Sequence, residues 1–241
     1  MQFEWINFYS EFATRLLEFK NNRAELIADI QSAYNAINMK LPKLEREDSI
    51  IDIDPFTVFG LFNKGITNAN RIAILESFAT VFNIKSKVPD NFDGIPVLNN
   101  LKATYYGFKD DRQAADIDNL WGLYESAINL AGKDDAANRE IFTKWYDTVH
   151  DQLGIRWNIT MGLYWIRPYE FINLDSINRW FIVDPDNMPV DFVNSVKKKL
   201  NKVPYAAEYL AIKDACLHAL KDGNYEYKNY PELSYSAWIV S

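Results

Sequence analysis

The sequence predicts a mainly α-helical fold: one compact domain of many helices, with a few short strands or extended loop segments. Apolar residues recur at every third or fourth position over long stretches, which is the spacing of one helix face. Hydrophobic residues make up 48% of the 241 positions and charged residues 24%, a balance typical of a packed core. No linker rich in proline, glycine or serine divides the chain. We therefore expect one domain over residues 1–241, and a sub-boundary, if there is one, near 85–110.

In the first half, helices are expected where apolar stripes coincide with capping residues. A stripe runs from Phe8 to Ile37, with Asn21-Asn22 as a candidate break. Asp54 can cap a short helix that has Pro55 at its first position. The expected helices are 3–38, 55–65 and 68–83, and the expected loops are 41–54 and 89–100, followed by a short extended or irregular piece at 105–108.

The second half repeats this design. Asp135 can cap a helix that Gly154 would stop, and Pro189 and Pro204 can each start a further helix. The expected elements are helices 113–131, 136–153, 189–200 and 204–221, and a tail, 225–241, that folds back on the body.

The stretch 156–180, which we call the elbow, differs from the rest of the chain. It gathers aromatic residues, arginines and asparagines without a lasting helical or strand period, and Gly162 and Pro168 interrupt it. Asp175 can cap a new helical turn within it. One interpretation is a recognition surface, because aromatic faces stack flat ligands, arginines grip phosphates and asparagines read base edges. The other, which the residue types alone favour, is a core hinge filled by Trp and Tyr.

Charge and cysteine content restrict the functional classes. The formal net charge is −7 and the pI about 5.0, so a protein whose whole surface grips nucleic acid is disfavoured, although a local basic patch is not. The single Cys216 rules out an internal disulfide framework and fits a reducing cytoplasm. No signal peptide opens the chain, and no stretch approaches eighteen apolar residues, so we expect a cytoplasmic protein with no membrane partner.

Several catalytic signatures are absent from the sequence. It has no phosphate-binding G-x-x-x-x-G-K-[ST] loop and no G-x-G-x-x-G turn. His150 and His218 each stand alone, without a partner at metal-ligand spacing. Asp52 and Asp54 are the tightest carboxylate pair, but capping is the favoured role of Asp54. We therefore expect no catalytic residue, metal site or cofactor site in this chain.

Four segments carry a family resemblance: IDIDPFTVFGLFNKGIT at 51–67, FDGIPVLNN at 92–100, 157–179 within the elbow, and YPELSYSAW at 230–238. Together they resemble the N-terminal region of bacterial AAA-family ATPases related to McrB, the GTP-dependent subunit of a modified-cytosine restriction system. The chain departs from the family pattern at Ile177, where an arginine is common. The resemblance implies downstream EVE-type reader and AAA+ motor domains outside this chain, with GTP or ATP and Mg²⁺ bound by the motor. It also implies a nuclease subunit as partner and a restriction or anti-phage role.

Two hypotheses of different classes follow. In the first, the chain is a specificity module that binds modified or unmodified DNA and accepts an extruded modified base in an aromatic pocket. Its candidate DNA-binding residues are Trp157, Asn158, Tyr164, Trp165, Arg167, Asn173, Arg179, Asn63, Lys64, Lys197, Lys198 and Lys199. In the second, the chain is an adaptor that positions the motor or binds the nuclease subunit, and the elbow is core. A third and weaker hypothesis is a nuclease that uses Asp52 and Asp54.

Overall fold

The computed structural model confirms a mainly helical domain and describes residues 3–47, 49–100, 104–223 and 225–241. The only bridge between extended segments in these ranges is a parallel one between Lys64 and Leu98. The helices are α1 (Trp5–Leu16), η1 (Leu17–Phe19), α2 (Arg23–Ala36), α3 (Pro55–Gly60), α4 (Asn68–Val81), α5 (Asp116–Gly132), α6 (Ala136–His150), α7 (Asn158–Ile166), α8 (Ser176–Ile182), α9 (Val190–Val196), η3 (Lys199–Asn201), α10 (Ala206–Asp222) and α11 (Tyr230–Ile239).

The capping residues expected from the sequence are in place. Asp54 accepts hydrogen bonds from the backbone N–H groups of Phe56 and Thr57, at 2.8 and 3.0 Å. Asp135 and Asp175 cap α6 and α8 in the same way. Each bond satisfies a backbone donor that the first turn of a helix leaves free. The first long helix does break at the expected asparagines, since Asn22 precedes α2. The tail, expected only to fold back on the body, contains a helix, α11, that packs on α8.

Some boundaries differ from expectation. The short helix from Pro55 ends at Gly60 rather than near residue 65, because the chain turns there and brings Lys64 beside Leu98. Helix α5 begins at Asp116 rather than at 113. The helix expected to reach residue 200 is split into α9 and η3.

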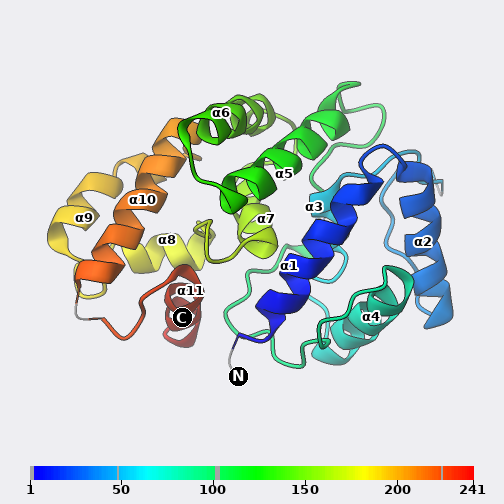
Figure 1. Cartoon of the computed structure of the whole chain (residues 1–241), viewed down its shortest axis with the longest axis horizontal. Helices are drawn as coiled ribbons and strands as arrows, with labels where there is room; N and C mark the ends of the chain where they lie inside the picture. Colours follow the sequence, from blue (N-terminus) through cyan, green and yellow to red (C-terminus); the bar gives the residue numbers. More distant parts are fainter. Residues whose placement is uncertain (1–2, 48, 101–103, 224) are drawn as a thin grey trace.

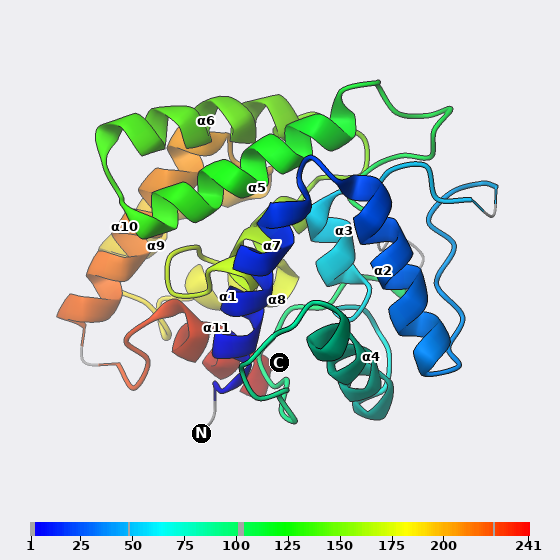
Figure 2. The ribbon, with the colours of Figure 1, turned by 45° about the vertical axis from the view of Figure 1, so that its right-hand side comes forward.

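The helices pack around a central pair. α1 and α7 lie in the middle of the molecule, with α9 and α10 at one end and α2 and α4 at the other (Figures 1 and 2). The α5–α6 hairpin covers the top in both views, and α11 packs on α8. Segments from both ends of the sequence therefore enclose the elbow.

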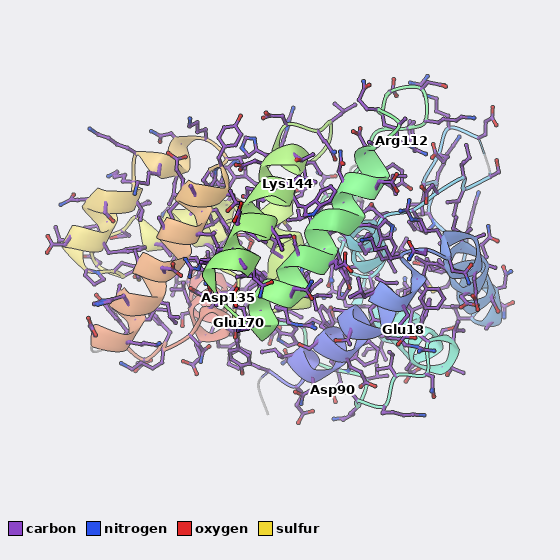
Figure 3. All side chains as sticks on the ribbon, turned by 45° about the horizontal axis from the view of Figure 1, so that its top comes forward. Glu18, Asp90, Arg112, Asp135, Lys144 and Glu170 are labelled. Carbon is purple, nitrogen blue, oxygen red and sulfur yellow. The ribbon has the colours of Figure 1, made fainter. Side chains whose placement is uncertain are left out.

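Aromatic rings fill the centre. Phe12 of α1 contacts Phe59 at 5.2 Å between ring centroids, Phe82 at 5.4 Å and Phe78 at 5.7 Å. Rings at these separations favour edge-on and tilted arrangements, which contribute to stability beyond the area that they bury. A buried ion pair lies just before the first residue of α5, where Arg112 donates to Glu45. Figure 3 labels Arg112 at this place.

Within the described ranges, no helix combines the length and apolarity that crossing a membrane requires.

The Asp54 carboxyl group gives the fold a pH dependence. The residue is 0% exposed, and its Oδ2 has no hydrogen-bond partner among the described residues. Burial raises the pKa of Asp54 from 3.8 to about 6, although the Phe56 and Thr57 N–H groups oppose the shift. The folded chain thus holds this proton more tightly than the unfolded chain does. The free energy of unfolding that the group contributes therefore falls as pH rises from about 4 to about 6.

Replacing Asp54 by Asn should remove this pH-dependent contribution to the free energy of unfolding, because the amide keeps an oxygen for the cap and cannot ionise. We expect the stability of the variant relative to the wild type to rise by on the order of 2 kcal/mol between pH 4 and pH 7. Urea unfolding at several pH values measures the difference, with the exposed Asp90→Asn as control. A difference that stays constant across this range would contradict the assignment.

Candidate functional site

Four of the twelve candidate DNA-binding residues are buried, which corrects their proposed role as direct contacts. Tyr164 and Asn173 are 1% exposed, and Trp165 and Asn63 are 0% exposed. A side chain with no accessible face cannot stack or hydrogen-bond a nucleotide. Helix α7 is buried from Ile159 to Ile166, because α1, α3 and α5 all pack against it. For Tyr164, Trp165 and Asn173, the three that belong to the elbow, the core interpretation holds.

Trp165 links the core to a surface loop. Its indole Nε1 donates to the carbonyl oxygen of Pro96 at 3.0 Å, and its ring stacks on Phe59 at an interplanar angle of 11°. A buried indole N–H needs such an acceptor, and this one belongs to the loop at 92–97. Trp165 therefore positions the loop rather than a ligand.

The other buried candidates have similar structural roles. Asn63 accepts a hydrogen bond from the Tyr9 hydroxyl at 2.7 Å, and Asn173 accepts one from the Asp175 N–H at 3.1 Å. Burial raises the pKa of Tyr164, so its phenol stays protonated. Arg167 is half-buried and joins the elbow to α1, because it donates to the Ser10 carbonyl and to the Thr14 hydroxyl.

The structure brings three candidates together at one cavity. Trp157, Asn158 and Arg179 line an open cavity of about 620 Å³, which we call the Trp157 pocket. Helices α4, α7, α8 and α11 and the loop at 92–97 form its walls. The full lining is Asn68, Arg71, Phe92, Asp93, Gly94, Ile95, Pro96, Val97, Trp157, Asn158, Met161, Asp175, Ser176, Ile177, Asn178, Arg179, Ser234 and Trp238.

The candidate lysines are not part of this lining. Lys197, Lys198 and Lys199 follow α9, which lies at the opposite end of the molecule from α4 (Figure 1). Lys64 is half-buried, and burial lowers the pKa of its ammonium group. The structure therefore separates the lysine run from the pocket, whereas Lys64 lies beside the pocket, since its carbonyl accepts from Arg71.

Trp157 and Arg179 form a stacked pair. The guanidinium carbon of Arg179 lies 3.7 Å from the centroid of the Trp157 ring, and its Nη1 donates to the Leu174 carbonyl at 2.7 Å. Partial burial lowers the pKa of Arg179, and the nearby Asp175 opposes this. Trp157 and Asn158 also line a second cavity, of about 500 Å³.

The loop at 92–97 is fixed by hydrogen bonds from two helices, α7 and α11, and a third helix, α8, supports the α11 bond. Besides the Trp165 bond, the Ser234 hydroxyl on α11 donates to the Gly94 carbonyl at 2.9 Å, and Asn178 on α8 donates to that hydroxyl at 3.2 Å. Gly94 has a φ of +76°, and a Cβ there would lie 2.7 Å from the Cα of Tyr235. These contacts therefore fix the part of the pocket wall that the loop forms in the absence of a ligand.

Sequence reasoning missed Arg71, the most unusual group in the pocket. It lies on α4, is 5% exposed, and places its guanidinium carbon 4.7 Å from the centroid of Phe92. Its Nη2 makes a long bond of 3.4 Å to the Lys64 carbonyl, and its Nε has no partner among the described residues. Its apolar helix gave no signal for a binding role. The only hint was that Phe92 and Ser234 belong to the segments that carry the family resemblance.

Two carboxylates also line the pocket. Asp175 accepts from Asn178 as a helix cap, and Asp93 accepts from Asn91. In the described part of the chain, no salt bridge joins either of them to Arg71 or Arg179. The pocket thus offers both positive and acidic groups on an aromatic wall. A carboxylate can accept a hydrogen bond from an exocyclic amino group, as Asp and Glu do from cytosine N4.

The weaker nuclease hypothesis receives no structural support at its two aspartates. Asp52 pairs with Arg23 at 2.9 Å, and Asp54 is buried as a cap. The described residues contain no group of three or more His, Cys, Asp or Glu side chains arranged to hold a metal ion.

A family model described as Domain of unknown function (DUF8425) matches residues 5–240. The chain belongs to this family. The match spans every helix from α1 to α11, so the Trp157 pocket lies entirely within the DUF8425 domain. No curated protein and no solved structure matches the chain. The McrB-like resemblance therefore stays a prediction.

Trp165→Ala should destabilise the domain, because truncating a large buried side chain costs about 3–5 kcal/mol. The melting temperature should fall by several degrees. The matched control is Trp180→Ala on α8, whose side chain is 50% exposed and should cost about 0.5 kcal/mol or less. Thermal unfolding of both variants checks this, and equal melting temperatures would exclude the core role.

Gly94→Ala should also destabilise the domain, by roughly 1–3 kcal/mol, because the added Cβ meets the α11 backbone at a strained φ. Gly132→Ala is the matched control, since a Cβ there meets nothing within 4 Å. At that helical position alanine should be neutral or stabilising by about 0.5–1 kcal/mol. Denaturant unfolding distinguishes the two. Loss of stability in both variants, or in neither, would argue against a steric cause at Gly94.

Proposed function

We propose that this DUF8425 domain is a DNA-recognition module and that the Trp157 pocket accepts a base extruded from the duplex. The observation that carries the proposal is the convergence of Trp157, Asn158 and Arg179 on one open, aromatic-lined cavity. A base inside a duplex exposes only its edges, so a protein that needs the whole base must take it out of the stack. A cavity of about 620 Å³ has room for a single base.

The pocket has the groups that base recognition requires. The stacked Trp157 and Arg179 offer a flat surface for a ring, and Asn158 can donate and accept hydrogen bonds at its edge. Asp93 and Asp175 can accept from an exocyclic amino group, which fits cytosine. This agrees with the modified-cytosine role that the McrB-like resemblance implies.

Contacts to the phosphates of the duplex outside the pocket would come from elsewhere on the surface. Lys197 and Lys198 are exposed, and Lys199 is half-buried. With a net charge of −7 the domain can neutralise few phosphates, so its affinity for an unmodified duplex should be weak and strongly dependent on salt. Binding would then depend mainly on the extruded base.

A second candidate function rests on the end of α11. Trp238, Ile239 and Val240 are 44%, 56% and 57% exposed, and they form a continuous apolar run. Such a run fits the adaptor hypothesis, in which the domain contacts a motor or a nuclease subunit. Both candidate functions are compatible with a restriction or anti-phage role, in which the domain is part of an ATPase that uses GTP or ATP.

Fluorescence anisotropy with labelled duplexes, unmodified and carrying modified cytosine, tests the proposal at two salt concentrations. We expect tighter binding to the modified duplex that persists at the higher salt. Trp157→Ala should weaken this binding by roughly 1–3 kcal/mol, the contribution of one stacked base. Trp180→Ala removes an exposed tryptophan outside the pocket lining and should bind as the wild type does.

Other outcomes separate the candidates. Equal binding to all duplexes that disappears at the higher salt would mean phosphate contact alone. No binding at either salt, from a domain that remains folded, would favour the adaptor.

A further inference from the structure

Arg71 is a buried cation that no carboxylate among the described residues neutralises. It is 5% exposed, and no carboxylate in the described part of the chain forms a salt bridge with it. Burial lowers the pKa of its guanidinium group, which reflects the cost of removing a charge from water. Buried arginines are normally paired, because an isolated charge in a protein interior is strongly unfavourable.

The contacts of Arg71 leave part of its hydrogen-bonding capacity unused. The ring of Phe92 covers one face at 4.7 Å, and the Lys64 carbonyl accepts one long bond of 3.4 Å. The Nε donor has no acceptor among the described residues, but it is fully enclosed, so an anion in the pocket would bind the Nη groups. A guanidinium can form two parallel hydrogen bonds to an anion with two oxygens, such as a phosphate. An anion in the Trp157 pocket, which Arg71 lines, would supply both the acceptors and the opposite charge.

The rest of the lining limits what this anion can be. Asp93 and Asp175 face the same cavity and would repel a ligand with several negative charges, so a triphosphate is disfavoured. The aromatic wall favours a ligand that also has a flat ring. Among ligands with a flat ring and one phosphate group, a single nucleotide is the one that fits the proposed binding of a base in this pocket.

We propose that Arg71 forms a phosphate subsite in the Trp157 pocket and that the ligand is a single nucleotide, with its phosphate on Arg71 and its base on the aromatic wall. The inference rests on the proposed function in that both use the same pocket. The phosphate can belong to a free nucleotide or to a nucleotide within DNA.

Calorimetric titration of the whole domain with deoxycytidine 5′-monophosphate and with deoxycytidine tests the subsite at constant ionic strength. The wild type should bind the monophosphate roughly tenfold more tightly than the nucleoside, as expected for hydrogen bonds to a charged group. Arg71→Gln should abolish this preference and leave nucleoside binding unchanged. Arg46→Gln, which removes an exposed arginine outside the pocket lining, should retain the preference.

An unchanged preference in Arg71→Gln, or equal binding of both ligands by the wild type, overturns the subsite. If Arg71→Gln does not fold, Arg71→Lys decides. Its ammonium group keeps the charge but lacks the planar fork, so the preference should fall to about a third or less, and an unchanged preference overturns the inference.

Duplex binding distinguishes the two proposals and the two sources of phosphate. If Arg71→Gln keeps the preference for the monophosphate and binds the modified duplex as tightly as the wild type, the subsite is wrong and DNA recognition stands. If the monophosphate binds through Arg71 but no duplex binds, DNA recognition is wrong and the subsite serves a free nucleotide. If Arg71→Gln loses both the preference for the monophosphate and the binding of the modified duplex, the phosphate that Arg71 binds belongs to a nucleotide within DNA.

Discussion

The pocket depends on one hydrogen bond between the core and the surface, from the Trp165 indole to the Pro96 carbonyl. Trp165 is fully buried against Phe59, so its position is determined by core packing rather than by solvent. Through this bond the core determines where the loop at 92–97 lies. The Ser234 hydroxyl holds the same loop from α11, at Gly94. A wall tied to two rigid elements can present ligand-binding groups without first paying the cost of ordering them.

Much of the fold could be predicted because its signals are local. Asp54, Asp135 and Asp175 bond to groups two or three residues away, so capping could be predicted from neighbouring residue types. Burial of the elbow could not be predicted with the same certainty. Whether Trp165 faces solvent or Phe59 depends on contacts about a hundred residues apart in sequence, and its residue type fits either environment.

The candidate site was predictable in part because some of its residues are also close together in the sequence. Trp157, Asn158 and Arg179 lie within one short stretch, and the turn between α7 and α8 brings them together. Arg71 was missed because an arginine on a helix is usually exposed. Only tertiary packing, with Phe92 over the guanidinium, shows that it is buried. The lysine run was predictable as a cluster of charge, but its distance from the pocket was not, since position along the chain does not determine position in space.

The burial of the tryptophans has a spectroscopic consequence. Trp5, Trp121 and Trp165 are among the largest fully buried side chains, whereas Trp157 is half-buried and stacks directly on a guanidinium. The emission of the three buried indoles should be shifted to the blue and should not respond to quenchers in the solvent. The emission of Trp157 should respond to a ligand that enters either of the two cavities that this residue lines. Intrinsic fluorescence can therefore report occupancy of the pocket without an added label.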